Sequence, residues 1–430
     1  MKGGGERSAA IGIVGGGLTG LALAHELSRR DVPHLVFEAS DRPGGVVRSE
    51  RVEGRLLEWG PQRGRLTEGL LAYVRELALE DELITAPPGL PLYVYADGAL
   101  REVPFSAWEF VTGDLLSWRA KLRVPLEVFT RGPDPRERVA DFFVRKIGRE
   151  AYERIVGPLY GGLYASDPAD MEVGLSVGHV LREFGIERSL LLPLLWRGGS
   201  ISPPAACSFR EGMQTLTEAL FEAHRERIRL SSPVLGLRPA GERGEGWTLE
   251  LEDGEVTVHR VVLTCPAGAT AGILETAASG PAERIASLNY NPLGVVHLHA
   301  DTDLEGLGYQ VSLAEDLATR GVTWNDSLFD RDGVYTVYLG GAKDPEVVDR
   351  PDDRLGAVAA REFASVTGFE ARVLSVEREA MPAWDVSWRA IQGLDLPDGI
   401  VVAANWESRP GIPGRLHQAR QLAERFADGG

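Results

Sequence analysis

The chain opens with an alternation of apolar runs and glycines that predicts a strand, a tight turn and a helix. Residues 9–14 have the sequence AAIGIV, three glycines follow, and the segment LALAHEL at 21–27 has the composition of a helix. A second apolar run at 34–37 predicts another strand. This order indicates a βαβ unit at the start of the chain.

The glycines between the first strand and the helix fit the GxGxxG pattern at Gly15, Gly17 and Gly20. Glycines at this spacing permit a tight turn, backbone access for a pyrophosphate and close packing of helix on strand, and the positive end of the helix faces the phosphates. Glu38 ends the second strand, where an acidic residue binds a ribose hydroxyl. We therefore expect a dinucleotide site; a glycine-rich turn without a ligand is the alternative.

A second set of glycines narrows the choice of nucleotide. The segment DRPGGVVR at 41–48 follows the second strand, and EWGPQ at 58–62 supplies a further turn. This succession resembles the amine oxidase and protoporphyrinogen oxidase class of FAD proteins, and the resemblance implies FAD. Arg42 and Arg48 are candidate partners for cofactor phosphate, although either could be a solvated surface residue.

Later segments resemble the protoporphyrinogen oxidase family in the same order, so that the likeness covers nearly the whole chain. They are residues 141–148, 155–168, 208–220, 306–308, 327–329, 339–341, 380–384 and 399–405. The resemblance places Val234 at the adenine side of FAD, with strand core as the alternative. It also implies that a last helix, led in by residues 411–413, points its N-terminus at the flavin ring, where free N–H groups stabilise negative charge.

The cofactor-binding residues that follow from these patterns and from the resemblance are Gly15, Gly16, Gly17, Leu18, Thr19, Gly20, Glu38, Ala39, Arg42, Gly45, Arg48, Gly60, Pro61, Gln62, Arg63, Val234, Trp384, Asn405, Gly411, Ile412 and Pro413.

The resemblance implies a mixed α/β fold with three parts. We expect a Rossmann-like FAD-binding domain from 8–88, 208–275 and 385–430, and an inserted substrate-binding domain with a mixed sheet from 89–103 and 276–384. We expect residues 104–207 to form a helical domain at the substrate or the membrane surface.

The resemblance also implies an activity, the oxidation of a porphyrinogen to a porphyrin by O₂ in haem biosynthesis. We assign no catalytic residue, since the cofactor carries the chemistry. Relatives often have an arginine near Leu92 that pairs with a substrate propionate, and here Arg63, Arg65 or Arg101 could compensate. Arg65, Arg101 and His179 are the candidate substrate residues.

Composition and charge limit the partners. The net charge of −17 argues against nucleic acid, because contacts to phosphates need clustered Lys and Arg. The two cysteines are far apart and show no CxxC pattern, so neither a disulfide framework nor a metal site is indicated. The N-terminal segment lacks the apolar run of a secretory signal and no stretch has the roughly 20 apolar residues of a spanning helix, so we expect a cytoplasmic protein.

The leucine-rich segment 188–197 ends in a tryptophan and has flanking arginines, which suits peripheral contact with the cytoplasmic face of a membrane. A wall of the substrate cavity is the alternative.

Other functions remain open from the sequence. The chain could be a flavin amine oxidase or desaturase acting on another substrate, or a non-catalytic tetrapyrrole-binding paralogue. The choice between protoporphyrinogen and coproporphyrinogen, and between monomer and homodimer, also stays open.

Overall fold

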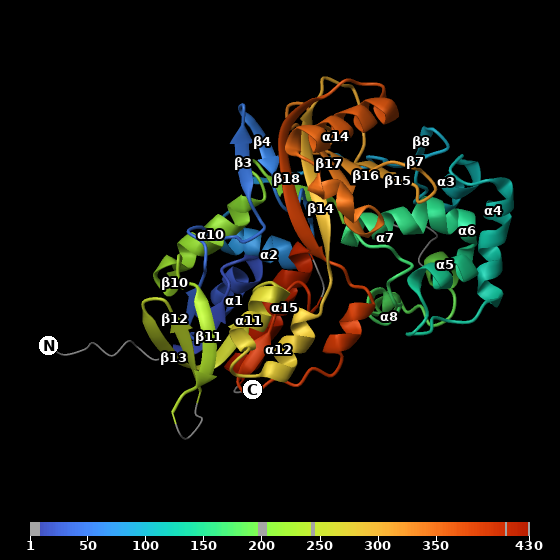
Figure 1. Cartoon of the computed structure of the whole chain (residues 1–430). Coiled ribbons are helices and arrows are strands. Elements are labelled where there is room, and N and C mark those ends of the chain that lie inside the picture. The colour runs from blue at the N-terminus through green and yellow to red at the C-terminus, as the bar shows by residue number, and fades with distance from the viewer. Residues whose placement is uncertain (1–8, 197–203, 242–245, 409–410, 429–430) are drawn as a thin grey trace.

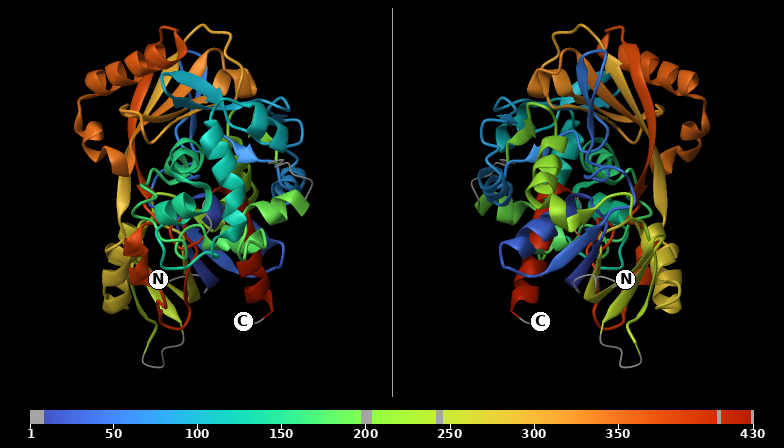
Figure 2. Two further views of the ribbon diagram at one scale, coloured as in Figure 1. Left: turned by 90° about the vertical axis from the view of Figure 1, so that its right-hand side faces the viewer. Right: turned by 90° about the vertical axis from the view of Figure 1, so that its left-hand side faces the viewer.

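The computed structural model describes residues 9–196, 204–241, 246–408 and 411–428. Two seven-stranded sheets lie one above the other, and two long strands, β14 and β18, run from the upper sheet down toward the lower one (Figure 1). Helices form a separate layer at one side, which faces the viewer in the left panel of Figure 2. This mixed architecture confirms the expected α/β fold class.

The first sheet contains the predicted βαβ unit. Its strands β1 and β13 run parallel, with Ile11 opposite Arg260 and Val14 opposite Leu263. Strand β19, from near the C-terminus, lies parallel to β13. The strand order is β10 (Ile228–Arg229), β2 (His34–Phe37), β1 (Ala9–Val14), β13 (Gly254–Leu263), β12 (Trp247–Leu251) and β11 (Val234–Pro239), with β19 (Ile400–Val402) joined to β13.

Helix α1 (Leu18–Ser28) is buried along nearly its whole length because it is mostly apolar, and its buried Glu26 is paired with Arg30 and Arg420. Ile11 and Ile13 of β1 share a core with it on one face of the first sheet. Helices α2 (Glu68–Glu76), α10 (Gln214–His224) and α15 (Ile412–Ala427) complete this layer, and α15 packs directly on α1. Helices α11 (Ala267–Leu274) and α12 (Ser279–Ala286) belong to the core of the opposite face.

The second sheet is mainly antiparallel and carries helix α14 (Asp352–Thr367) on one face. Val296, Val337 and Phe363 belong to the core between sheet and helix. The strand order is β18 (Arg372–Pro382), β14 (Tyr290–His299), β17 (Val334–Gly340), β16 (Thr319–Trp324), β15 (Gly308–Val311), β7 (Leu92–Ala96) and β8 (Ala99–Glu102), and α13 (Asn325–Phe329) follows β16.

Two smaller sheets connect these layers: β3 (Ser49–Val52) pairs with β4 (Arg55–Glu58), and β9 (Ala206–Phe209) lies between β5 (Gly64–Arg65) and β6 (Leu83–Thr85). Every strand of the first sheet comes from residues 8–88, 208–275 or 385–430, and every strand of the second from 89–103 or 276–384. We propose these ranges, with 104–207, as the three domains.

The helical layer consists of short segments, and a buried ion pair ties them together. Lys146 Nζ lies 3.0 Å from Glu127 Oε2, and both side chains are fully buried. Glu127 also accepts hydrogen bonds from Ser189 Oγ and from the N–H of Leu191. These bonds hold the pKa of Glu127 below its usual value against the opposing effect of burial. The segments are α3 (Ala107–Thr112), α4 (Trp118–Arg123), a 3₁₀ segment η1 (Val124–Phe129), α5 (Val139–Ile147), α6 (Arg149–Ala151), a π-helical segment η2 (Tyr152–Val156), α7 (Gly157–Tyr164), α8 (Gly178–Glu183) and α9 (Leu191–Trp196).

Within the described residues, no helix combines the length and the apolar character that crossing a membrane would require.

Glu58, at the end of β4, joins the two large sheets. Its carboxylate accepts hydrogen bonds from Ser49 Oγ at 2.6 Å and from the N–H of Met213, just before α10, at 2.8 Å. Its backbone carbonyl accepts one from Nε2 of His297, on β14 of the second sheet, at 2.9 Å. Burial lowers the pKa of His297 to about 4, so the imidazole is neutral at physiological pH.

Burial raises the pKa of Glu58 to about 7, although the hydrogen bonds from Ser49 and Met213 act in the opposite direction. A carboxyl whose pKa is higher in the folded than in the unfolded chain stabilises the fold fully below the unfolded pKa, and this contribution is lost as the pH rises through about 7.

We expect Glu58→Gln to gain stability relative to the wild type as the pH rises from 5 to 8. The neutral amide removes the cost of burying a charge, and the gain should approach about 3 kcal/mol, since a shift of one pKa unit corresponds to about 1.4 kcal/mol. Thermal unfolding of both proteins at each pH measures the difference. Glu50→Gln, at an exposed site on β3, controls for the loss of a carboxylate. A difference that is constant with pH would contradict the assignment.

Candidate functional site

The turn between β1 and α1 is closed so tightly that it needs glycine. Gly15 has a φ of +109°, and a Cβ at Gly20 would lie 2.0 Å from the carbonyl oxygen of Gly15. Thr264, which follows β13, donates from Oγ1 to the carbonyls of Val14 and Gly15, each at 3.0 Å. The first turn of α1 is thereby held directly above the end of the strand.

Glu38 lies at this turn, as its position after β2 predicts. One carboxylate oxygen accepts the N–H of Gly16 at 2.6 Å, and the other accepts the N–H and the hydroxyl of Ser40 at 2.8 and 2.7 Å. The side chain is only partly buried. Each carboxylate oxygen has two lone pairs, so Glu38 can accept further hydrogen bonds from a ligand.

The second glycine pair packs on the first. The N–H of Gly44 donates to the carbonyl of Gly16 at 2.9 Å, and a Cβ at Gly45 would lie 3.2 Å from Cα of Gly17. At Gly17 itself, at the N-terminus of α1, an added Cβ would meet no atom nearer than 3.9 Å. Backbone N–H groups therefore border open space at the positive end of the helix, which suits a pyrophosphate.

The two predicted phosphate-binding arginines make protein contacts. Arg42 donates to the carbonyl of Gly45 at 2.8 Å, which keeps it at the second glycine pair. Arg48 pairs with Glu50 and lies over the ring of Trp59 at 5.2 Å. Arg42 is thus placed beside the glycine turn, whereas Arg48 is engaged by β3 and β4.

The EWGPQR segment leads from the glycine turns to the second sheet. A Cβ at Gly60 would lie 1.9 Å from the carbonyl oxygen of Val46, so the segment passes in close contact with the loop that follows the second glycine pair. Gln62 is buried, and its Oε1 accepts hydrogen bonds from Asn325 at 2.7 Å and Thr336 at 2.8 Å. Arg63 reaches the carbonyl of Leu307 at 3.5 Å.

The end of the chain returns to the same place. Strand β19 continues the first sheet, and Gly411, with a φ of +87°, turns the chain into α15 against α1. Ile412 is buried, whereas Asn405 and Gly411 are exposed. The two ends of the chain therefore lie together in the first sheet and its helix layer, with α15 packed against α1 (Figure 1).

Val234 and Trp384 lie on different segments. The N–H of Ser232 donates to the carbonyl of Glu38 at 2.8 Å, which brings the start of β11 and the buried Val234 beside the ribose-binding candidate. Trp384 has a φ of +51° and stacks on Trp388 with 5.4 Å between ring centroids.

The candidate substrate residues are not brought together. Arg101 forms an ion pair with Asp114 at 2.5 Å, and Arg65 is exposed on the short strand β5. The side chain of His179 lies outside the described part of the structure. Thr264 was not predicted, because an isolated Thr after a strand carries no pattern that marks it.

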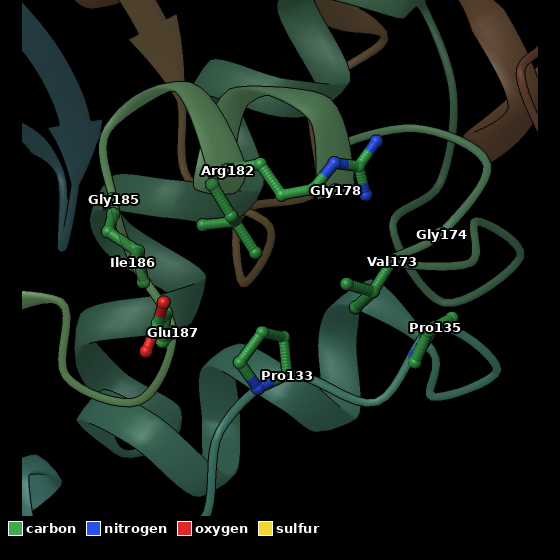
Figure 3. A pocket seen from close by; sticks show the side chains of 10 residues that line it. Pro133, Pro135, Val173, Gly174, Gly178, Arg182, Gly185, Ile186 and Glu187 are labelled. Atoms are coloured by element: carbon green, nitrogen blue, oxygen red, sulfur yellow. The ribbon is translucent and has the colours of Figure 1, made fainter.

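Two pockets lie away from the glycine turns. One, of about 400 Å³, is in the helical layer, where Pro133, Val173, Leu181, Arg182 and Glu187 are among the residues that line it (Figure 3). The other, of about 540 Å³, lies between the proline-rich segment 87–91 and residues 302–305. Among the described residues, no group of three or more His, Cys, Asp or Glu side chains is arranged to hold a metal.

Curated relatives span most of the chain. A chloroplastic protoporphyrinogen oxidase of Spinacia oleracea is 28% identical over 394 residues, which are 82% of this chain and 70% of the relative. The human protoporphyrinogen oxidase is 27% identical over 369 residues, or 77% of each chain.

Solved structures share the fold across the whole chain. A protein of Exiguobacterium sp. 255-15, whose description as a protoporphyrinogen oxidase is provisional, superposes with a TM-score of 0.79 at 21% identity and covers 99% of this chain and 100% of its own. Cyclohexylamine oxidase of Brevibacterium oxydans superposes with a TM-score of 0.70 at 15% identity, covering 98% and 99%. At these identities the structures support the fold alone.

The sequence pattern of one family, described as flavin containing amine oxidoreductase, matches residues 18–408. This match confirms the expected oxidoreductase class and the flavin cofactor, and the dinucleotide turn agrees with FAD. The chain belongs to the family of flavin-containing amine oxidoreductases.

Proposed function

We propose that this protein oxidises a porphyrinogen, protoporphyrinogen IX or coproporphyrinogen III, to the porphyrin with O₂ as acceptor, as a step of haem biosynthesis. The observation that carries the proposal is the convergence of both chain ends on one glycine-lined turn beside the second sheet. The names of the curated relatives, which span about four fifths of the chain, favour a porphyrinogen over an amine as substrate.

We infer which residues would hold FAD. The turn from Gly15 to Gly20 and the N-terminus of α1 would take the pyrophosphate, and Glu38 would accept the ribose hydroxyls. Val234 would lie by the adenine, while Gly60 and Ile412 would lie toward the flavin ring.

FAD, when bound, supplies the acceptor for a hydride from a porphyrinogen carbon. The chain's own contribution is to bind and orient the cofactor and a flat tetrapyrrole, and to keep water away from the reacting carbon. The N–H groups at the start of α15 would stabilise negative charge at this end of the site. Since aromatisation drives the reaction, the proposal needs no side chain as acid or base.

We also propose that the helical layer makes peripheral contact with a lipid surface. Its exposed apolar side chains are Trp108, Val111, Trp118, Leu122, Leu126, Phe129, Phe184 and Leu192. They lie mainly on α3, α4 and η1 rather than on the segment 188–197 in which the sequence suggested a contact. Ser189 in that segment is buried, Arg197 lies outside the described residues, and the side chains of 194–196 are likewise not described. Indole rings beside cations such as Arg119 suit the interface of a bilayer.

Glu38→Ala should weaken FAD binding about tenfold or more, because a charged hydrogen-bond acceptor for the ribose is lost. Flavin absorbance per protein after purification and titration of the apoprotein with FAD measure the loss. Glu80→Ala, at an exposed site, is the matched control. Equal flavin content and affinity in both variants would remove Glu38 from the site.

The activity test uses the flavin-loaded protein under air. Protoporphyrinogen or coproporphyrinogen should give porphyrin fluorescence together with hydrogen peroxide, and the faster of the two identifies the substrate. Peroxide from amines without porphyrin formation would instead favour an amine oxidase. Binding of porphyrin without turnover would favour a tetrapyrrole-binding paralogue.

Sedimentation with phospholipid vesicles tests the lipid contact. We expect the wild type to bind and the triple variant Trp118→Ser, Leu122→Ser, Phe129→Ser to lose most of the bound fraction, because these side chains supply the apolar area. Leu235→Ser removes an exposed leucine from β11 in the first sheet and should bind as the wild type does. If all three proteins remain in the supernatant, the contact does not exist.

A further inference from the structure

We propose that Arg63 is the residue that binds a carboxylate of the substrate, a role that rests on the proposed oxidation of a porphyrinogen. The expected cofactor-binding role of Arg63 would thereby be replaced by a specificity-determining one.

Arg63 has no acidic partner in the described residues. Its hydrogen bond there runs from Nη1 to the carbonyl of Leu307, at the long distance of 3.5 Å, and it forms no ion pair. A guanidinium carries five N–H donors, so most of them are left for something other than the protein.

Arg63 is nevertheless desolvated. Burial lowers its pKa, and the nearby charge of Arg65 acts in the same direction, while Tyr338 opposes them. Part of the side chain remains accessible, although protein atoms enclose it. A desolvated charge without a counter-charge costs stability, and such groups occur where a ligand completes the pairing.

The surroundings of Arg63 combine a donor with an apolar surface. Burial raises the pKa of Tyr338, on β17, to about 12, although hydrogen bonds with Thr323 and Gln62 act in the opposite direction, so its hydroxyl stays neutral beside Arg63. Tyr338 also packs at the edge of an apolar cluster that contains Ala165, Leu293 and Val295. A cation and a hydroxyl next to an apolar face suit a flat apolar ligand that carries carboxylates.

The position of Arg63 beside the second sheet also supports a contact with the substrate. Leu307 donates its N–H to the carbonyl of Pro91 at 2.8 Å, and the next residue, Gly308, pairs with Leu92 in the parallel register of β15 and β7. Arg63, which directly precedes β5, therefore reaches the edge at which β15 lies beside β7 in the second sheet.

Three other arginines near the second sheet are either bonded to protein groups or exposed to solvent. Arg101 pairs with Asp114, and Arg65 is exposed. Arg331 donates to the carbonyls of Arg210 and Phe209 at 2.8 and 2.7 Å. Among these, Arg63 is the one that is both enclosed and without a strong protein acceptor.

The test measures binding of the product to the FAD-loaded protein, so it does not depend on turnover. Coproporphyrin III carries carboxylates and fluoresces, and its titration gives a Kd. We expect Arg63→Met to raise that Kd about 10- to 100-fold, the effect of losing a charge-assisted hydrogen-bonded pair, and Arg63→Lys to raise it less. The tetramethyl ester, which lacks carboxylates, should bind the wild type and Arg63→Met equally.

A second readout checks that Arg63→Met is folded. Because it removes an unpaired, desolvated charge, the melting temperature without ligand should stay the same or rise. Arg75→Met, at an exposed site on α2, is the matched control and should bind coproporphyrin as the wild type does.

Each other outcome overturns the proposal in a distinguishable way. An unchanged Kd in Arg63→Met excludes the carboxylate contact. Loss of FAD from Arg63→Met assigns the arginine to the cofactor. An equal loss of affinity for the ester shows a packing defect, and a fall in melting temperature shows a structural role. If the wild type binds neither porphyrin, the proposed function falls together with the inference.

Discussion

The close approach of α1 to the end of β1 is the constraint on which the rest of the site depends. Any side chain at Gly20 would collide with the carbonyl of Gly15, and Thr264 holds that carbonyl from the neighbouring strand. The approach places the free N–H groups of the first helical turn next to Glu38 and the second glycine pair. Every other part of the cofactor site is arranged around this turn.

A second set of contacts fixes the second sheet relative to the turn. Glu58 holds the start of α10 with its carboxylate and His297 of β14 with its carbonyl, so one residue joins the two sheets. Gln62, four residues later, bonds to Asn325 and Thr336 of the second sheet. The segment between them therefore has one fixed course, and Arg63 follows directly from it. A polar network that is satisfied in this way can hold a neighbouring residue in an otherwise unfavourable place.

That network explains how a charged side chain can be kept without a partner. Pro61 and the buried Gln62 precede Arg63. Gly64 of β5, which follows it, pairs with Cys207 of β9. These contacts fix the backbone on both sides of Arg63. The surrounding hydrogen bonds thereby offset the cost of enclosing a charged side chain at this position.

The sequence by itself determined the local parts of this protein. The glycine spacing, the apolar runs and the acidic residue after the second strand act over short stretches of chain, so they predicted the βαβ unit, a dinucleotide-binding turn and the position of Glu38. The family resemblance extended this to FAD and to the mixed fold. It did not reveal that Arg101 pairs with Asp114, that Glu58 joins the two sheets, or that the exposed apolar side chains gather on α3, α4 and η1. Only the tertiary structure decided these points, because partners, burial and exposure depend on segments that are distant in sequence and meet only after folding.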